Sequence, residues 1–154
     1  MDKAKLEELY NRGYYYSVPK GVSMWPLIKS PDTIVNIVRV DGELKRYDVA
    51  LYARESTHQY VLHRILKVEK DNYIFYGDNC WQREVIPKDK VVGIATKYNR
   101  KGRWIDADNM WLKIYAHIWC DPLIVRRAIL RLRDEVKKVL RRVKKLWKKI
   151  KRSN

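Results

Sequence analysis

Short runs with a hydrophobic–polar period of two fill the middle of the chain, from about residue 14 to residue 105. Because this period places alternate side chains on opposite faces of a strand, each run predicts a β-strand. Turn-forming residues separate the runs, as at Asp41-Gly42 and in the loop 77–90. The pattern predicts a mainly β unit built largely from hairpins, with strands at Tyr14–Val18, Thr33–Val40, Tyr47–Ala53, Tyr60–Val68, Tyr73–Tyr76, Val91–Tyr98 and Arg103–Ile105.

Helical spacing replaces this pattern at both ends of the chain. Leu6, Leu9 and Tyr10 recur at helical intervals before Gly13, which predicts a short helix over residues 2–12. After residue 106 the pattern is helical again, and Pro122 divides it into a Trp-rich segment and a long basic segment. We therefore expect three parts, which are an N-terminal helix (1–13), a β domain (14–105) and a strongly basic, amphipathic helical tail (106–154), and we expect the tail to begin against the β domain and then leave it.

The long basic segment has an apolar residue alternately every four and every three positions. This heptad spacing makes one apolar stripe along a helix, and most of the other positions are Lys or Arg. The apolar stripe comprises Val125, Ile129, Leu132, Val136, Val139, Val143, Leu146 and Ile150, and it is broadened by Leu140 and Trp147.

Positive charge is concentrated in the same segment. The chain has 34 Lys and Arg against 18 Asp and Glu, a net charge of +16, and residues 121–154 contain 14 of those basic residues and 3 of the acidic ones. Cationic flanks would repel in a coiled-coil homodimer, and a nucleic-acid arm would have only Trp147 as an aromatic residue. We therefore favour binding of residues 122–152 to an anionic membrane surface, with docking on the chain's own domain as a further alternative.

Several classes of protein are excluded. With 46% hydrophobic residues the chain should fold. No stretch has the roughly 18 consecutive apolar residues of a spanning helix, and the N-terminal segment is unlike a secretory signal peptide. Cys80 and Cys120 lie far apart without metal-ligand spacing, so we expect no metal. Few cysteines fit a reducing environment, so we expect a cytoplasmic location, peripheral at the inner face of the membrane when the tail is bound. No organic cofactor is implied either.

One serine is placed for chemistry. In the segment Gly-Val-Ser-Met-Trp-Pro, Gly21 permits close approach and Pro26 stops strand pairing, so Ser23 should be accessible. A hydroxyl becomes nucleophilic when a neighbouring base takes its proton, and His63 is the histidine inside a predicted strand. The period of two places His63 on one face of that strand and Arg64 on the other. That His63 is simply a core histidine remains an alternative.

These residues belong to motifs in a recognisable order. The Ser-Met-x-Pro box at Ser23, the His-Arg pair at His63 and the Gly-Asp-Asn box at 77–79 resemble, in order and approximate spacing, the signal peptidase I family of serine endopeptidases. Asp-Thr-Ile-Val at 32–35, Tyr-Asp-Val at 47–49 and Val-Gly-Ile-Ala at 92–95 are similar to further family segments. The resemblance covers about residues 18–97. His63 stands where most bacterial members have lysine, as in the Ser-His branch of the family.

The resemblance implies a small signal-peptidase-like β-barrel or coiled sheet. It also implies a serine endopeptidase that hydrolyses a precursor or leader peptide bound in extended conformation, with Ser23 as nucleophile and His63 as general base. Asp78 is the expected partner that orients the imidazole. Two alternatives to that role are that Asp78 only closes its turn and that Glu84 is the orienting carboxylate.

Further residues are expected around this pair. The oxyanion and substrate cleft would be formed by Gly21, the Ser23 amide, Met24, Trp25 and Pro26, while Arg64 and Gly77 would give structural support. Met24 and Trp25 are alternatively half-buried apolar residues without a role in binding. The rival interpretation of the whole chain is a non-catalytic peptide- or membrane-binding module on the same scaffold, because the family's carboxylate pattern downstream of Gly-Asp-Asn is missing.

Overall fold

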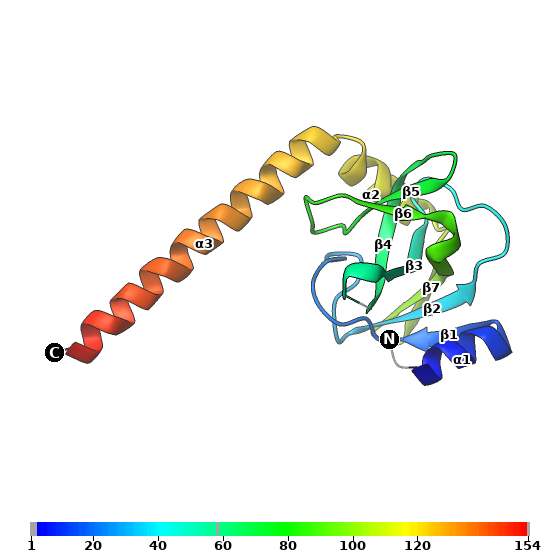
Figure 1. Ribbon diagram of the computed structural model, residues 1–154, viewed down its shortest axis with the longest axis horizontal. Helices are drawn as coiled ribbons and strands as arrows, with labels where there is room; N and C mark the ends of the chain where they lie inside the picture. The colour runs from blue at the N-terminus through cyan, green and yellow to red at the C-terminus, as the bar shows by residue number, and fades with distance from the viewer. Residues whose placement is uncertain (1–2, 58, 154) are drawn as a thin grey trace.

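The computed structural model describes residues 3–57 and 59–153, and the side chains of residues 4–57 and 59–144. A short helix precedes a sheet, and two helices follow it (Figure 1). The helices are α1 (Lys3–Arg12), α2 (Met110–Cys120) and α3 (Leu123–Ser153), with single 3-10 turns at η1 (Glu55–Thr57) and η2 (Lys88–Lys90). The strands are β1 (Tyr14–Ser17), β2 (Thr33–Arg39), β3 (Val49–Arg54), β4 (Gln59–Val68), β5 (Asn72–Tyr76), β6 (Glu84–Pro87), β7 (Val91–Arg100) and β8 (Arg103–Asp106).

Within the described residues, the eight strands form one antiparallel sheet in the order β1-β2-β7-β3-β4-β5-β6, with β8 paired to β7. The register shifts between Asn36 and Ile37, between Leu51 and Tyr52, and between Ile65 and Lys67. Such bulges bend a strand and increase its twist, so the sheet curls into a half-barrel. The prediction of a mainly β protein with helices at both ends is confirmed.

Both faces of the curled sheet are buried. One core cluster consists of Leu9, Tyr15, Met24, Ile28, Val35, Ile37, Val49, Leu51, Leu62, Ala95 and Tyr98. A second consists of Leu44, Ala50, Tyr52, Ile65, Tyr73, Phe75, Ile86 and Val91. Strand β4 contributes Leu62 to the first cluster and Ile65 to the second. His63 and Arg64 therefore lie on opposite faces of β4, as the period of two predicts.

Strand β6 lies inside a segment that the sequence predicts as loop. The prediction of a loop from Gly77 to Lys90 is wrong for Glu84–Pro87, which pairs with β5 at the edge of the sheet. The strand is short, only Ile86 in it is buried, and it ends in Pro87. A proline is tolerated at an edge because no ladder hydrogen bond needs its nitrogen, but in the sequence it argues against a strand.

The basic tail begins against the sheet and then leaves it, as expected (Figure 1). In the first turns of α3, Arg126 and Leu130 are 2% and 3% exposed, whereas residues 135–144 are all exposed. The side chains of the apolar stripe are also exposed, from 49% at Val136 to 67% at Leu132. Leu146, Trp147 and Ile150 lie outside the described side chains. Within the described residues, no helix combines the length and the hydropathy that crossing a bilayer requires.

Candidate active site

Ser23 lies in the loop that joins β1 to β2. Gly21 turns this loop with a φ of +93°, a left-handed conformation that costs glycine little. The next residue after the serine, Met24, is buried in the core, and its carbonyl accepts a hydrogen bond of 2.9 Å from the Ile28 amide. Met24 thus anchors the loop from below, and Ser23 stays half-buried at the rim.

Met24, Trp25 and Pro26 do not form the predicted cleft beside Ser23. The Met24 sulfur points into the core, where it accepts a hydrogen bond of 3.5 Å from the Asp78 amide. Trp25 is 51% exposed, and Pro26 lines a separate small cavity of about 180 Å³ beside α2. The sequence could not separate these positions, because an apolar residue in a loop can serve equally as a core anchor or as a cleft wall.

The Gly-Asp-Asn box holds the Ser23 loop in place. The Asn79 amide donates a hydrogen bond of 2.7 Å to the Ser23 carbonyl, and its side-chain Nδ2 donates one of 2.9 Å to the Val22 carbonyl. Gly77 packs so tightly that a Cβ atom there would lie 2.7 Å from the Ser23 carbonyl oxygen and 3.0 Å from His63 Nε2. Glycine is required at this position because any side chain would collide with backbone.

His63 lies at the middle of β4 and is 4% exposed. Its Nδ1 atom lies 3.1 Å from the Tyr52 hydroxyl and 3.3 Å from Glu84 Oε1. Burial raises the pKa of the Tyr52 phenol, so the hydroxyl keeps its proton. With Nδ1 held by these two groups, the opposite ring nitrogen, Nε2, is directed toward Gly77 and the Ser23 loop.

The backbone of Ser23 and the ring of His63 come together at Gly77. The Ser23 carbonyl oxygen, His63 Nε2 and the Cys80 sulfur all lie within 3.0 Å of the point that a Gly77 Cβ would occupy. No hydrogen bond joins the Ser23 hydroxyl to His63 among the described residues. Such bonds are often long or misaligned without substrate and tighten when it binds.

Glu84 is the carboxylate on His63. It enters from β6, and Arg54 of β3 grips it through two hydrogen bonds of 2.7 and 2.5 Å. Burial raises the pKa of the Glu84 carboxyl, but hydrogen bonds from His63 and Arg54 outweigh that effect and lower it from 4.5 to about 2. Glu84 is therefore ionised at any mild pH and can hold a proton on His63 Nδ1.

Asp78 does not contact His63, contrary to the role expected for it. Its carboxylate is fully buried and forms two hydrogen bonds, of 2.8 and 2.7 Å, with the Arg64 guanidinium. The Tyr115 hydroxyl donates a third at 3.1 Å. Because His63 and Arg64 point to opposite faces of β4, a carboxylate that pairs with Arg64 faces away from the imidazole. Asp78 and Arg64 together tie the loop after β5 to the sheet and to α2.

The backbone amide of Ser23 is a further polar group of the site. Within the described part of the chain it donates no hydrogen bond, although the neighbouring Asn79 and Trp25 amides both do. In acyl-transfer enzymes, an unpaired backbone N–H beside the reacting serine is the kind of donor that stabilises an oxyanion.

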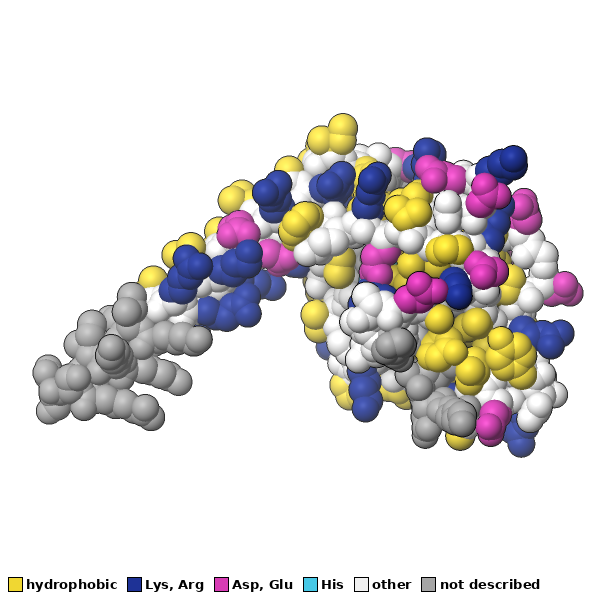
Figure 2. All heavy atoms as spheres, in the orientation of Figure 1, with side chains coloured by type: hydrophobic (Ala, Val, Ile, Leu, Met, Phe, Trp, Pro, Cys, Tyr) yellow, Lys and Arg dark blue, Asp and Glu magenta, His cyan; other side chains and the backbone are white. Residues whose placement is uncertain are grey.

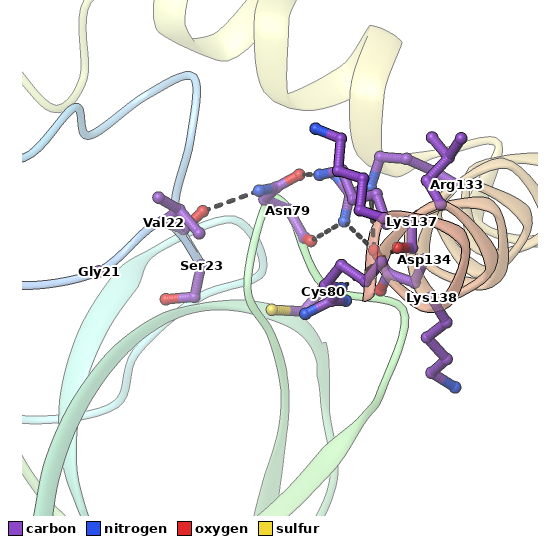
Figure 3. A pocket seen from close by; sticks show the side chains of 12 residues that line it. Gly21, Val22, Ser23, Asn79, Cys80, Arg133, Asp134, Lys137 and Lys138 are labelled. Atoms are coloured by element: carbon purple, nitrogen blue, oxygen red, sulfur yellow. Dashed lines mark hydrogen bonds and ion pairs between the residues drawn. The ribbon is translucent and has the colours of Figure 1, made fainter. Parts of the chain in front are cut away.

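A groove of about 830 Å³ runs between the Ser23 loop and α3. Figure 3 shows Ser23 and Cys80 on one side of it and the α3 side chains on the other. Asn79 is hydrogen-bonded to Val22 on the first side and to Arg133 on the second. Arg133 of α3 donates hydrogen bonds to the Asn79 side chain and, at 3.2 Å, to its carbonyl. This Ser23 groove is lined by Gly21, Val22, Ser23, Asn79, Cys80, Arg133, Asp134, Lys137, Lys138, Leu140, Arg141 and Lys144.

Sequence reasoning missed the part that α3 plays in this site. Arg126, 2% exposed, donates hydrogen bonds of 2.5 and 3.3 Å to the Gly77 and Cys80 carbonyls. The Arg131 guanidinium lies 5.5 Å from the centre of the Trp81 ring. The one signal that the sequence offers for this docking face is that residues 123–134 contain four arginines and no lysine, whereas lysines predominate further along the helix.

Among the described residues, no three His, Cys, Asp or Glu side chains gather as a metal site. Comparison of the chain with protein-family models, with curated proteins and with solved structures finds no match in any of the three. The site therefore has to be interpreted from its own geometry.

Proposed function

We propose that the chain is a serine endopeptidase of the signal-peptidase-like Ser-His type, on a signal-peptidase-like half-barrel, that hydrolyses a peptide bond in a precursor or leader peptide. The observation that carries the proposal is the orientation of His63. Its Nδ1 faces Glu84 and Tyr52, and its Nε2 faces the point where the Ser23 loop and Gly77 meet. A Ser-His-carboxylate relay requires this order of groups.

The groups of the site divide the steps of the reaction between them. His63 Nε2 takes the proton of the Ser23 hydroxyl as the oxygen attacks the substrate carbonyl. The free Ser23 amide donates to the resulting oxyanion, and Glu84 stabilises the imidazolium through Nδ1. His63 then gives the proton to the leaving amine, which leaves an acyl group on Ser23. Water, deprotonated by the same imidazole, hydrolyses this ester and restores the hydroxyl.

A fluorophosphonate probe tests the proposal, because it reacts with an activated serine without knowledge of the natural substrate. We expect labelling of the wild-type chain, none of Ser23→Ala and a loss of at least about a hundredfold in rate for His63→Ala. Ser17→Ala, at the end of β1, is the matched control and should label like the wild type. Equal labelling of the wild type and Ser23→Ala, or none of either, would leave the non-catalytic binding module as the better interpretation.

We further propose that α3 holds the protein at an anionic membrane surface. The apolar stripe supports this, because it faces away from the β domain. Hydrophobic side chains follow the outer edge of α3 in Figure 2, with Lys and Arg beside them. A helix with an exposed apolar stripe and cationic flanks can lie in the headgroup region of a bilayer without crossing it. Binding to anionic vesicles is the test.

A further inference from the structure

The Ser23 groove carries more positive charge than the proposed reaction needs. Its α3 wall has one acid, Asp134, and five basic residues, Arg133, Lys137, Lys138, Arg141 and Lys144. Two of the five are paired within the helix, since Arg133 lies 2.8 Å from Asp134 and Lys138 lies 2.7 Å from Glu135. Lys137, Arg141 and Lys144 have no acidic partner among the described residues.

These three cations form one row along the groove. Lys137, Arg141 and Lys144 are spaced by four and three positions, so they lie on the same side of α3 and span about 10 Å. Figure 3 shows the beginning of this wall, where Lys137 follows Arg133 along the helix opposite Ser23. Apart from Leu140, which lines the groove, the apolar stripe lies on another face of the helix, so the row stays open to an occupant of the groove when the stripe is covered.

An extended acidic peptide matches the row. Such a chain advances about 3.3 Å per residue, so alternate side chains on one side lie about 7 Å apart. Two or three carboxylates at alternate positions therefore cover the length of the three cations. A nucleic acid fits less well, because none of the residues that line the groove is aromatic and bases would have no ring to stack on.

We infer that the substrate carries a cluster of Asp or Glu residues near its scissile bond, which Lys137, Arg141 and Lys144 bind. The inference rests on the proposed function, because it treats the occupant of the groove as the substrate of Ser23. The row selects acidic peptides, and the Ser23–His63 pair cuts them.

The test is binding of two fluorescent peptides to full-length Ser23→Ala, which cannot turn them over. The peptides have equal length and differ only in that one has Glu and the other Gln at three alternate positions. We expect the Glu peptide to bind about tenfold more tightly, the size expected of three partly exposed ion pairs, and to lose that advantage at high salt.

Two triple variants test whether the preference for the Glu peptide comes from the three cations of the groove. Lys137→Gln, Arg141→Gln and Lys144→Gln together should abolish the preference for Glu. Lys113→Gln, Arg127→Gln and Arg142→Gln together remove the same charge from exposed positions outside the groove and should keep it. Circular dichroism checks that both triple variants remain helical.

Three outcomes would overturn the inference. They are equal binding of the two peptides, an equal loss in both triple variants, and displacement of the Glu peptide by single-stranded DNA at lower concentrations than by unlabelled Glu peptide. Ser23 labelling without a preference for Glu would keep the peptidase and remove the acidic substrate. A preference for Glu without labelling would keep the acidic site and remove the peptidase.

Discussion

Glu84 and Asp78 each contact a side chain of β4, but Glu84 contacts His63 and Asp78 contacts Arg64. Glu84 contacts His63 and Arg54 at the rim of the site, where its side chain is 24% exposed. Asp78 is 0% exposed and contacts Arg64 and Tyr115 on the opposite face. Neutralising the two carboxylates should therefore have different effects: Glu84→Gln should mainly lower the activity, and Asp78→Asn should mainly lower the stability.

Glu84→Gln should lower the rate of Ser23 labelling by about 10²–10⁴-fold, because Nδ1 of His63 loses its carboxylate. Stability should fall by only about 1–3 kcal/mol above pH 5. The folded-state pKa of Glu84, about 2, lies below its ordinary 4.5, so the stabilisation by its charge is present above pH 4.5 and lost as the pH falls toward 2. The stability difference between wild type and Glu84→Gln, from urea unfolding, should shrink over that range. A constant difference down to pH 2 would contradict this assignment.

Asp78→Asn should destabilise the fold by about 3–5 kcal/mol, because it leaves the buried Arg64 guanidinium without its charge partner. Asp32→Asn is the matched control, since Asp32 pairs at 3.4 Å with Lys29 on the surface and should cost less than about 1 kcal/mol. Urea unfolding followed by circular dichroism measures both. If Asp78→Asn unfolds like the wild type yet loses Ser23 labelling, Asp78 and not Glu84 orients the histidine.

The sequence predicts those residues of the candidate site whose placement depends only on their neighbours in the chain. Ser23 follows from a glycine and a proline that end strand pairing, and His63 from its place in a strand with a period of two. Glu84 cannot be assigned in this way, because its contact with His63 depends on β6 pairing with β5 and β5 with β4. The β6 sequence Glu-Val-Ile-Pro has two apolar residues side by side and ends in proline, so no period of two marks it as a strand.

Among the elements of the fold, the loop that carries Gly77 packs directly against the loop that carries Ser23. Gly77→Ala should abolish Ser23 labelling and cost about 1–3 kcal/mol, because the new Cβ would lie 2.7 Å from the Ser23 carbonyl oxygen and must move that loop. Gly42→Ala is the control. At that position φ is +88° with open space around it, so some strain but normal labelling is expected. Normal labelling of Gly77→Ala would show that the Ser23 loop is free to move.

Helix α3 shows what the sequence predicts of an element and what it does not. The heptad spacing predicts the apolar stripe, and its described part, from Val125 to Val143, is exposed along the helix in the structure. The spacing does not say which face meets the sheet, and an apolar stripe is the usual choice. Here the face that docks carries Leu130, which is buried, and three arginines, Arg126, Arg131 and Arg133. The arginines contact carbonyl groups, an amide and the Trp81 ring of the loop after β5.

At the scale of the whole molecule, the exposed apolar stripe predicts binding to a surface. The full chain should sediment with vesicles that contain anionic lipid and be released at high salt, because each basic residue near such a surface contributes about 1 kcal/mol. Replacing Val136, Val139 and Val143 together by Thr should weaken binding by about tenfold or more. The same change at Val18, Val68 and Val85, which are exposed on the β domain, should have no effect. Failure to bind vesicles, with binding of duplex DNA, would favour the nucleic-acid arm.

The direction in which α3 leaves the sheet also determines how high the Ser23 groove would stand above a bilayer. The helix has 31 residues, or about 46 Å at 1.5 Å per residue, and its first turns are fastened to the loop that carries Asn79. When the apolar stripe rests at the boundary between headgroups and acyl chains, the groove would stand about one helix diameter, roughly 10 Å, above that boundary. Under the proposed function, a protein embedded in the same bilayer would be cut only where its chain emerges by that distance, so the helix would set the position of cleavage.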